Sequence, residues 1–237
     1  MINFRVFFLF SLKLYEMKKI LTGIIVLGSM CIQAQESDFR TWGILNINQK
    51  IDNDFSFQSD IQYRAYEDLD QLQQLLIRGG IGYNLTENNN NVLVGYAYIQ
   101  NRTPSVTDDY AHSHEHRLYQ QFNTKHAIEQ FNFAHRFRFE ERFLEHDTQF
   151  RFRYQLTTTV PLNNPKLIEN TWYLKAYNEL FLQAVKNQTF DRNRLGLNLG
   201  YVISPVFSLE AGYMLQSLKK SHTDQLMVGL TINNPIK

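Results

Sequence analysis

Residues 131–143 have the sequence FNFAHRFRFEERF, and this stretch decides the fold because its side chains change character at alternate positions. One set is apolar, and its members are Phe131, Phe133, Phe137, Phe139 and Phe143. The alternating set is polar, with Asn132, Arg136, Arg138, Glu140 and Arg142. Successive side chains of a β-strand point to opposite faces, whereas a helix of about 3.6 residues per turn would scatter both sets. The stretch therefore predicts a strand with one apolar and one polar face.

The same alternation recurs along the chain after residue 35. It is clear over 55–66, 150–160, 194–203, 207–216 and 226–232, and weaker over 39–49, 72–84, 92–100, 113–124 and 171–183. With 131–143 these make eleven segments, although residues 117–130 also allow a helical interpretation. Bacterial single-chain membrane barrels have an even number of strands, so we expect ten or twelve.

The amino end differs from the rest of the chain and predicts an export signal. Residues 20–32 (ILTGIIVLGSMCI) are thirteen uncharged residues that follow two lysines, too few to cross a bilayer as a helix. The small Ala34 suits cleavage before Gln35, and lipidation of Cys31 is disfavoured by the bulky Met30. Met17 opens a conventional signal by itself, so residues 1–16 are either an over-long start or an extension. We expect a signal peptide over 1–34 and a single barrel domain over 35–237.

Alternation alone does not distinguish a membrane barrel from a soluble sandwich or lipocalin-like barrel, because exchanging inside and outside preserves the pattern. Most segments have nine or more residues, which suits a membrane strand better than the ~5–6 residues typical of soluble strands. The polar faces hold many arginines and few lysines, unlike a typical soluble surface. Aromatic residues near strand ends suggest an interfacial girdle of Trp42, Tyr83, Tyr154, Trp172, Tyr201 and Tyr213. The predicted fold class is all-β, an antiparallel transmembrane β-barrel of about 10 to 12 strands.

Turned inward, the polar faces would give this barrel an Arg-rich lumen. The predicted lumen-lining residues are Arg64, Arg117, Arg136, Arg138, Glu140, Arg142, Arg151, Arg153, Lys175, Glu179, Arg192 and Arg194. Ions with little water must be paired, so the favoured interpretation is a structural interior cross-linked by ion pairs. The alternative is an anion-attracting passage or binding pocket, because excess fixed positive charge raises the local anion concentration.

Seven spaced segments also resemble a known family. They are DFRTWGILNINQK (38–50), HRLYQQF (116–122), RFRFEERF (136–143), RFRYQLTTTVPL (151–162), WYLKAYNELF (172–181), FDRNRLGLNLGY (190–201) and LEAGYMLQ (209–216). Together they resemble the predicted outer-membrane β-barrel family called domain of unknown function 2490, from about residue 38 to residue 232. The resemblance implies an outer-membrane barrel with no assigned activity, and it carries over no functional residue.

A histidine cluster is the candidate metal site. His112, His114 and His116 alternate along a predicted strand, so they share one face and could surround a Zn or Cu ion. Asp108 and Asp109 are near in sequence, but no fourth ligand is evident. A solvated or interfacial histidine cluster is the favoured interpretation, and we predict no metal and no other cofactor.

An outer-membrane lipid hydrolase would need a serine activated by a histidine. Ser113 adjoins two histidines and Ser221 adjoins His222, but neighbouring strand residues point to opposite faces, and no G-x-S-x-G motif is found. We therefore predict no catalytic residue. The net charge of +1 gives no reason to expect nucleic acid as a partner.

These observations predict a porin-like, non-enzymatic protein of the outer membrane of a Gram-negative bacterium, with a structural or narrow-channel role. Its expected partners are outer-membrane lipid and, during insertion, the barrel-assembly machinery. The alternatives are a lipid-hydrolysing barrel enzyme and a soluble periplasmic binding barrel, and the oligomeric state is left open.

Overall fold

A computed structural model of the protein describes residues 38–66, 71–86, 89–105, 110–185 and 188–236. The predicted signal peptide over 1–34 lies outside the described residues, as do Asp108 and Asp109 beside the histidine cluster. Within the described residues, no helix has the length and apolar character needed to cross a membrane.

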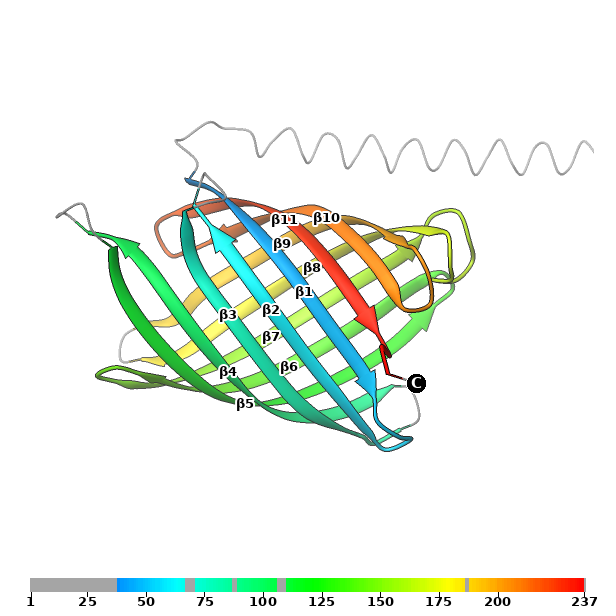
Figure 1. Ribbon diagram of the computed structural model, residues 1–237, viewed down its shortest axis with the longest axis horizontal. Helices are drawn as coiled ribbons and strands as arrows, with labels where there is room; N and C mark the ends of the chain where they lie inside the picture. The colour runs from blue at the N-terminus through cyan, green and yellow to red at the C-terminus, as the bar shows by residue number, and fades with distance from the viewer. Residues whose placement is uncertain (1–37, 67–70, 87–88, 106–109, 186–187, 237) are drawn as a thin grey trace, which may run out of the picture. The chain divides into compact units, whose positions relative to one another are not determined.

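Strands account for all the regular secondary structure of the described residues (Figure 1). They are β1 Asp38–Lys50, β2 Phe55–Ala65, β3 Leu72–Asn84, β4 Asn90–Pro104, β5 Tyr110–Ile128, β6 Phe131–Leu144, β7 Thr148–Pro161, β8 Thr171–Val185, β9 Gln188–Val202, β10 Phe207–Ser217 and β11 His222–Asn233. The helical alternative for 117–130 is wrong, because β5 runs through most of it and pairs with β4 and β6 along its length.

The strands close into one barrel in which each strand lies beside its neighbours in sequence and β1 meets β11. The β1–β11 pair is parallel, from Asp38 opposite Thr223 to Asn48 opposite Asn233, and every other pair is antiparallel. Strands of this order alternate in direction, so the first and eleventh run the same way and close in parallel. The prediction of a barrel with ten to twelve strands is confirmed. The predictions of an even number of strands and of a wholly antiparallel wall are wrong.

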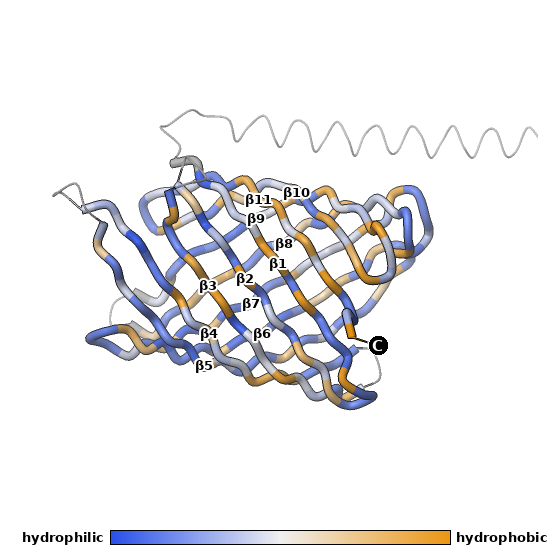
Figure 2. Tube along the Cα trace, in the orientation of Figure 1, coloured by the Kyte–Doolittle hydropathy of each residue, from blue (hydrophilic) through white to orange (hydrophobic). Residues whose placement is uncertain are grey.

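The wall has two chemically different faces, visible as alternating colours along the strands in Figure 2. Exposed outward side chains on β2–β7 and β9–β11 form what we call the outer belt. Its members include Ile61, Ile77, Val94, Leu118, Phe137, Phe139, Phe150, Phe152, Leu195, Leu197, Leu199, Leu209, Leu226 and Val228. An exposed apolar surface of this extent is unusual for a monomeric soluble protein.

Trp42 is the exception among the predicted girdle residues. Tyr83, Trp172 and Tyr213 are exposed, but Trp42 is buried and lines the barrel interior. Its place follows from strand phase, because Trp42 alternates with Gly43 and so shares a face with Asn46 and Asn48, which also point inward.

Three inward tyrosines each lie across a glycine on the neighbouring strand. A Cβ atom built on any of these glycines would collide with the ring of its partner. The pairs are Tyr119 with Gly95, Tyr173 with Gly200 and Tyr177 with Gly196. Glycine in a strand allows such close approach, and the aromatic ring covers the backbone that it leaves bare.

Candidate functional site

The barrel encloses a cavity of about 660 Å³ whose lining comes from all eleven strands. Eleven basic side chains line it: Arg64, Arg78, Arg117, Arg136, Arg138, Arg142, Arg151, Arg153, Lys175, Arg192 and Arg194. The acidic side chains in the lining are Asp60, Glu115, Glu179 and Glu210. The structure thus brings together every predicted lumen residue except Glu140, which is packed behind this surface and is 1% exposed.

Strand register explains why these charges are crowded. Arg138 on β6 lies opposite Arg153 on β7, and Arg117 on β5 lies opposite Arg142 on β6. Like charges directly opposite on one face repel each other, so such pairs need an anion between them. Carboxylates from the same strands provide it.

Glu140 is the first of two carboxylates that are shared by several arginines. Its Oε2 accepts hydrogen bonds from Arg151 Nε at 2.9 Å and Nη2 at 2.5 Å, and its Oε1 accepts one from Arg153 Nη1 at 2.6 Å. Arg138 Nη1 lies 3.7 Å from Oε1, and Arg117 Nη1 lies 4.0 Å from Oε2. Four guanidinium groups from three strands therefore depend on one buried carboxylate.

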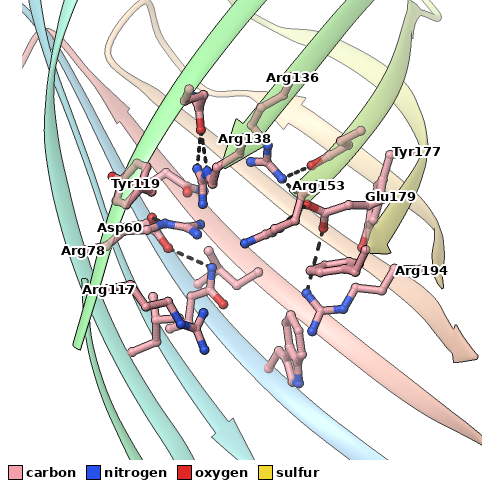
Figure 3. Close-up of a pocket in the computed structure, with 18 of the residues that line it drawn as sticks. Asp60, Arg78, Arg117, Tyr119, Arg136, Arg138, Arg153, Tyr177, Glu179 and Arg194 are labelled. Atoms are coloured by element: carbon pink, nitrogen blue, oxygen red, sulfur yellow. Dashed lines mark hydrogen bonds and ion pairs between the residues drawn. The ribbon is translucent and has the colours of Figure 1, made fainter. Parts of the chain in front are cut away.

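Glu179 on β8 is the second shared carboxylate, and Figure 3 shows Arg136, Arg153 and Arg194 directed toward it. Its Oε1 accepts hydrogen bonds from Arg153 Nε at 2.9 Å and Arg136 Nη2 at 2.7 Å. Arg194 Nη1 stays 3.9 Å from Oε2, which is too long for a hydrogen bond. The carboxylate is 4% exposed, so these pairs lie away from bulk solvent.

Smaller ion pairs surround these two centres. Glu115 accepts from Arg117 Nε at 2.5 Å and from Arg142 Nε at 2.6 Å. Further pairs join Asp60 to Arg78, Lys175 to Glu210, and Asp191 to both Arg151 and Arg192. Buried charges cost stability unless they are paired and hydrogen-bonded, and this network meets that condition for most of the cations.

Aromatic rings hold several of the same arginines. The Phe181 ring is 1% exposed, and the guanidinium carbons of Arg153 and Arg194 lie 4.5 Å and 4.7 Å from its centroid. Trp42 has Arg64 at 3.7 Å and Arg194 at 4.9 Å from its ring. Cation–π contacts stabilise positive charge without a counter-ion. They help to explain how the interior holds more arginines than carboxylates.

Trp42, Phe181 and Asp191 are among the interior residues that the sequence did not place there. The inward position of Phe181 could have been predicted from strand alternation, because Phe181 follows Lys175 and Glu179 on the polar face of β8. The inward position of Asp191 could not have been predicted in this way. The β8–β9 register shifts where Phe181 pairs with Arg192 and Leu182 with Phe190, so Asp191 is left without a Cα partner. This irregularity lets both Asp191 and Arg192 contribute to the interior network.

The histidine cluster lies on the other face of the wall. His114 Nδ1 is 2.7 Å from the Tyr98 hydroxyl, and His116 Nδ1 is 2.5 Å from the Tyr96 hydroxyl. His112 is exposed on the same strand, and the neighbouring Glu115 points inward to Arg117. In the part of the chain that the structure describes, no group of three or more His, Cys, Asp or Glu side chains is placed to hold a metal ion.

The fold and this interior define a class: a closed β-barrel with an apolar outer wall and a cationic interior crossed by ion pairs. The chain matches the family model described as Protein of unknown function (DUF2490) over residues 39–227, and it belongs to that family. The family resemblance predicted from its strand segments is thus confirmed. No curated protein and no solved structure matches the chain.

Proposed function

We propose that this protein is a non-enzymatic, porin-like barrel of the outer membrane of a Gram-negative bacterium, with a narrow interior that passes small anions. The observation that carries the proposal is the combination of the outer belt with an interior in which basic side chains outnumber acidic ones. The outer belt supports a membrane location, and the excess of basic side chains in the interior supports the passage of anions.

The membrane location is supported by strand length and wall chemistry. The shortest strands, β2 and β10, have 11 residues. At about 3.3 Å per residue, such strands can cross an apolar band about 25 Å tall even when tilted. A closed barrel leaves no unpaired sheet edge, which lipid requires. The partners proposed on this basis are outer-membrane lipid and the barrel-assembly machinery during insertion.

The passage is supported by the cavity and its charge. Fixed positive charge in a low-dielectric wall raises the local concentration of anions and lowers that of cations. The arginine side chains that project into the cavity and pair with Glu140 and Glu179 would restrict the passage to small solutes. These same ion pairs favour a second candidate, a purely structural barrel that conducts no ions.

The location is tested first by fractionation of the producing cell. We expect recovery with the outer membrane and a gel mobility that changes on boiling in detergent. Recovery in the soluble periplasmic fraction, with mobility unaffected by boiling, would reject the membrane location and favour a soluble binding barrel.

The passage is tested by conductance of the purified barrel in planar bilayers under a potassium chloride gradient. We expect a small conductance whose reversal potential shows preference for chloride. Equal permeation of the two ions or cation preference would reject the anion passage, and absence of conductance would favour the structural candidate.

A further inference from the structure

A second cavity of about 310 Å³ lies at the end of the barrel where β1 begins and where β2 and β4 end. We call it the vestibule, and its lining includes Trp42, Arg64, Asn101, Arg102, Arg192 and Gln216. Among the described residues that line it there is no Asp or Glu side chain. The described lining of the vestibule thus has basic side chains without a carboxylate, unlike the lining of the larger cavity.

Arg64 joins the two cavities, because it lines both. Its Nη2 donates to Gln62 Oε1 at 2.6 Å, and its guanidinium lies on the Trp42 ring, so it is held by a neutral amide and a ring. In the described part of the chain, neither Arg64 nor Arg102 has a carboxylate within ion-pair distance.

Three donor atoms of residues that line the vestibule have no hydrogen-bond partner among the described protein groups. They are the buried Nε atoms of Arg64 and Arg102 and the buried indole Nε1 of Trp42, which is 5% exposed. These donors come from three strands, β1, β2 and β4. Donors that belong to separate strands around one cavity suit an anion with acceptor oxygens pointing in several directions, as in a tetrahedral phosphate group.

We infer that the vestibule binds the phosphate group of a small solute, with Arg64, Arg102 and the Trp42 N–H as its recognition groups. A phosphate dianion would match the two arginines that have no carboxylate partner among the described residues. Guanidinium forks bind phosphate oxygens in pairs of hydrogen bonds, and Trp42 keeps the Arg64 fork in place through its ring. The inference deepens the proposed function, since it rests on that cationic interior and names the anion class that would enter it.

The test is isothermal titration of the full chain, folded in detergent, with inorganic phosphate, a sugar phosphate and acetate at constant ionic strength. We expect saturable binding of phosphate and at least tenfold weaker binding of acetate. Stronger binding of the sugar phosphate would identify an organic phosphate as the source, and equal or stronger binding of inorganic phosphate would identify the free ion. Absence of saturable phosphate binding, or acetate binding as tight as phosphate, would overturn the inference.

Two variants separate recognition from folding. Arg64→Gln should weaken phosphate binding by at least tenfold. Trp42→Phe keeps the ring beside Arg64 and removes the N–H, so binding should weaken several-fold while the circular dichroism spectrum of the folded barrel stays unchanged. Lys166→Gln, in the loop at the opposite end, is the control for loss of one positive charge and should bind like the unaltered chain. Unchanged affinity in both vestibule variants would overturn the assignment.

This experiment is independent of membrane location and of conductance. Phosphate binding by a barrel that conducts no current would support the phosphate site and reject the anion passage. Anion-selective current without phosphate binding would support the anion passage and reject the phosphate site.

Discussion

Glu140 shows how much of the interior depends on a single side chain. It is 1% exposed and lies within ion-pair distance of Arg117, Arg138, Arg151 and Arg153. A buried carboxylate with this many partners is costly to remove, because the cations that it neutralises stay buried.

Glu140→Gln should therefore lower the free energy of unfolding by about 3–5 kcal/mol. The amide preserves the shape of the side chain but not its charge. Denaturant unfolding of the folded barrel in detergent would measure the loss. The matched control is Glu141→Gln, one residue further on and on the outer face, where the carboxylate accepts a 3.4 Å hydrogen bond from Gln120. The control should change stability by less than about 0.5 kcal/mol; similar losses in the two variants would contradict the shared role of Glu140.

The tyrosines that lie across glycines give a second prediction for single residues. Gly196→Ala would place a methyl group inside the ring of Tyr177, so Tyr177 would have to move within a packed interior. We expect a loss of about 1–3 kcal/mol in the free energy of unfolding.

Gly229→Ala is its control, because the added Cβ would meet Ile44 Cβ at 3.8 Å, an ordinary contact. This variant should be close to neutral in the same unfolding measurement. A neutral Gly196→Ala would show that the ring does not lie against this glycine.

Residue type and position in the strand alternation together predict which face of the barrel wall most side chains occupy. Charged residues such as Arg138 and Arg153 were placed by alternation alone, which needs no knowledge of neighbours. Trp42 was misplaced because a tryptophan near a strand end suits an interface by type, whereas its phase on β1 puts it inside. Asp191 depends on a register shift between two strands, and no local pattern reports such a shift.

Single strands were the best predicted elements. The predicted segment 72–84 coincides with β3, and 131–143 differs from β6 by one residue. The weaker segments 92–100 and 113–124 were too short, because β4 and β5 pair with each other well beyond their alternating parts, from Asn90 with Thr124 to Pro104 with Tyr110. Pairing with a neighbour extends a strand past the point where its own sequence requires it.

The outer belt permits a test at the scale of elements. Leu197 on β9 is outward and 43% exposed. In lipid, Leu197→Arg should cost about 2–4 kcal/mol, because a charge in the apolar band of a membrane barrel is poorly solvated. Unfolding in lipid vesicles would measure this loss.

Leu167 provides the matched control, since it is 42% exposed in the loop between β7 and β8, beyond the ends of these strands. Leu167→Arg should be nearly neutral. Equal effects of the two substitutions would mean that water, and not lipid, covers the outer belt.

The parallel pairing of the first and last strands was the feature of the whole barrel that the sequence did not predict. Alternation identifies strands and faces, but the direction in which the first and last strands meet is a property of the complete sheet. Eleven segments were identified, and ten or twelve strands were then expected because bacterial single-chain membrane barrels have even numbers. The parallel β1–β11 pair removes the need for an even number.

A disulfide test examines this closure. Asn46 on β1 and Thr231 on β11 are direct partners, with side chains in contact at 3.4 Å although 185 residues separate them. With Cys31 replaced by serine, the pair Asn46→Cys and Thr231→Cys should cross-link on mild oxidation and change the mobility of the unfolded chain on a non-reducing gel. The pair Asn46→Cys and Asn233→Cys is two positions out of register and should cross-link much more slowly. Equal rates would contradict the parallel seam.

The difference between the buried ion pairs and the vestibule has a consequence for how the protein should respond to salt. Dissolved ions screen charges that water can reach and have little effect on pairs that it cannot. The Glu140 and Glu179 pairs are almost fully buried, whereas Arg64 and Arg102 line the vestibule and have no carboxylate partner among the described residues. Between 0.1 M and 1 M salt, the free energy of unfolding should therefore change little, whereas the phosphate affinity inferred for the vestibule should fall. Salt would then regulate binding by the protein without weakening its fold.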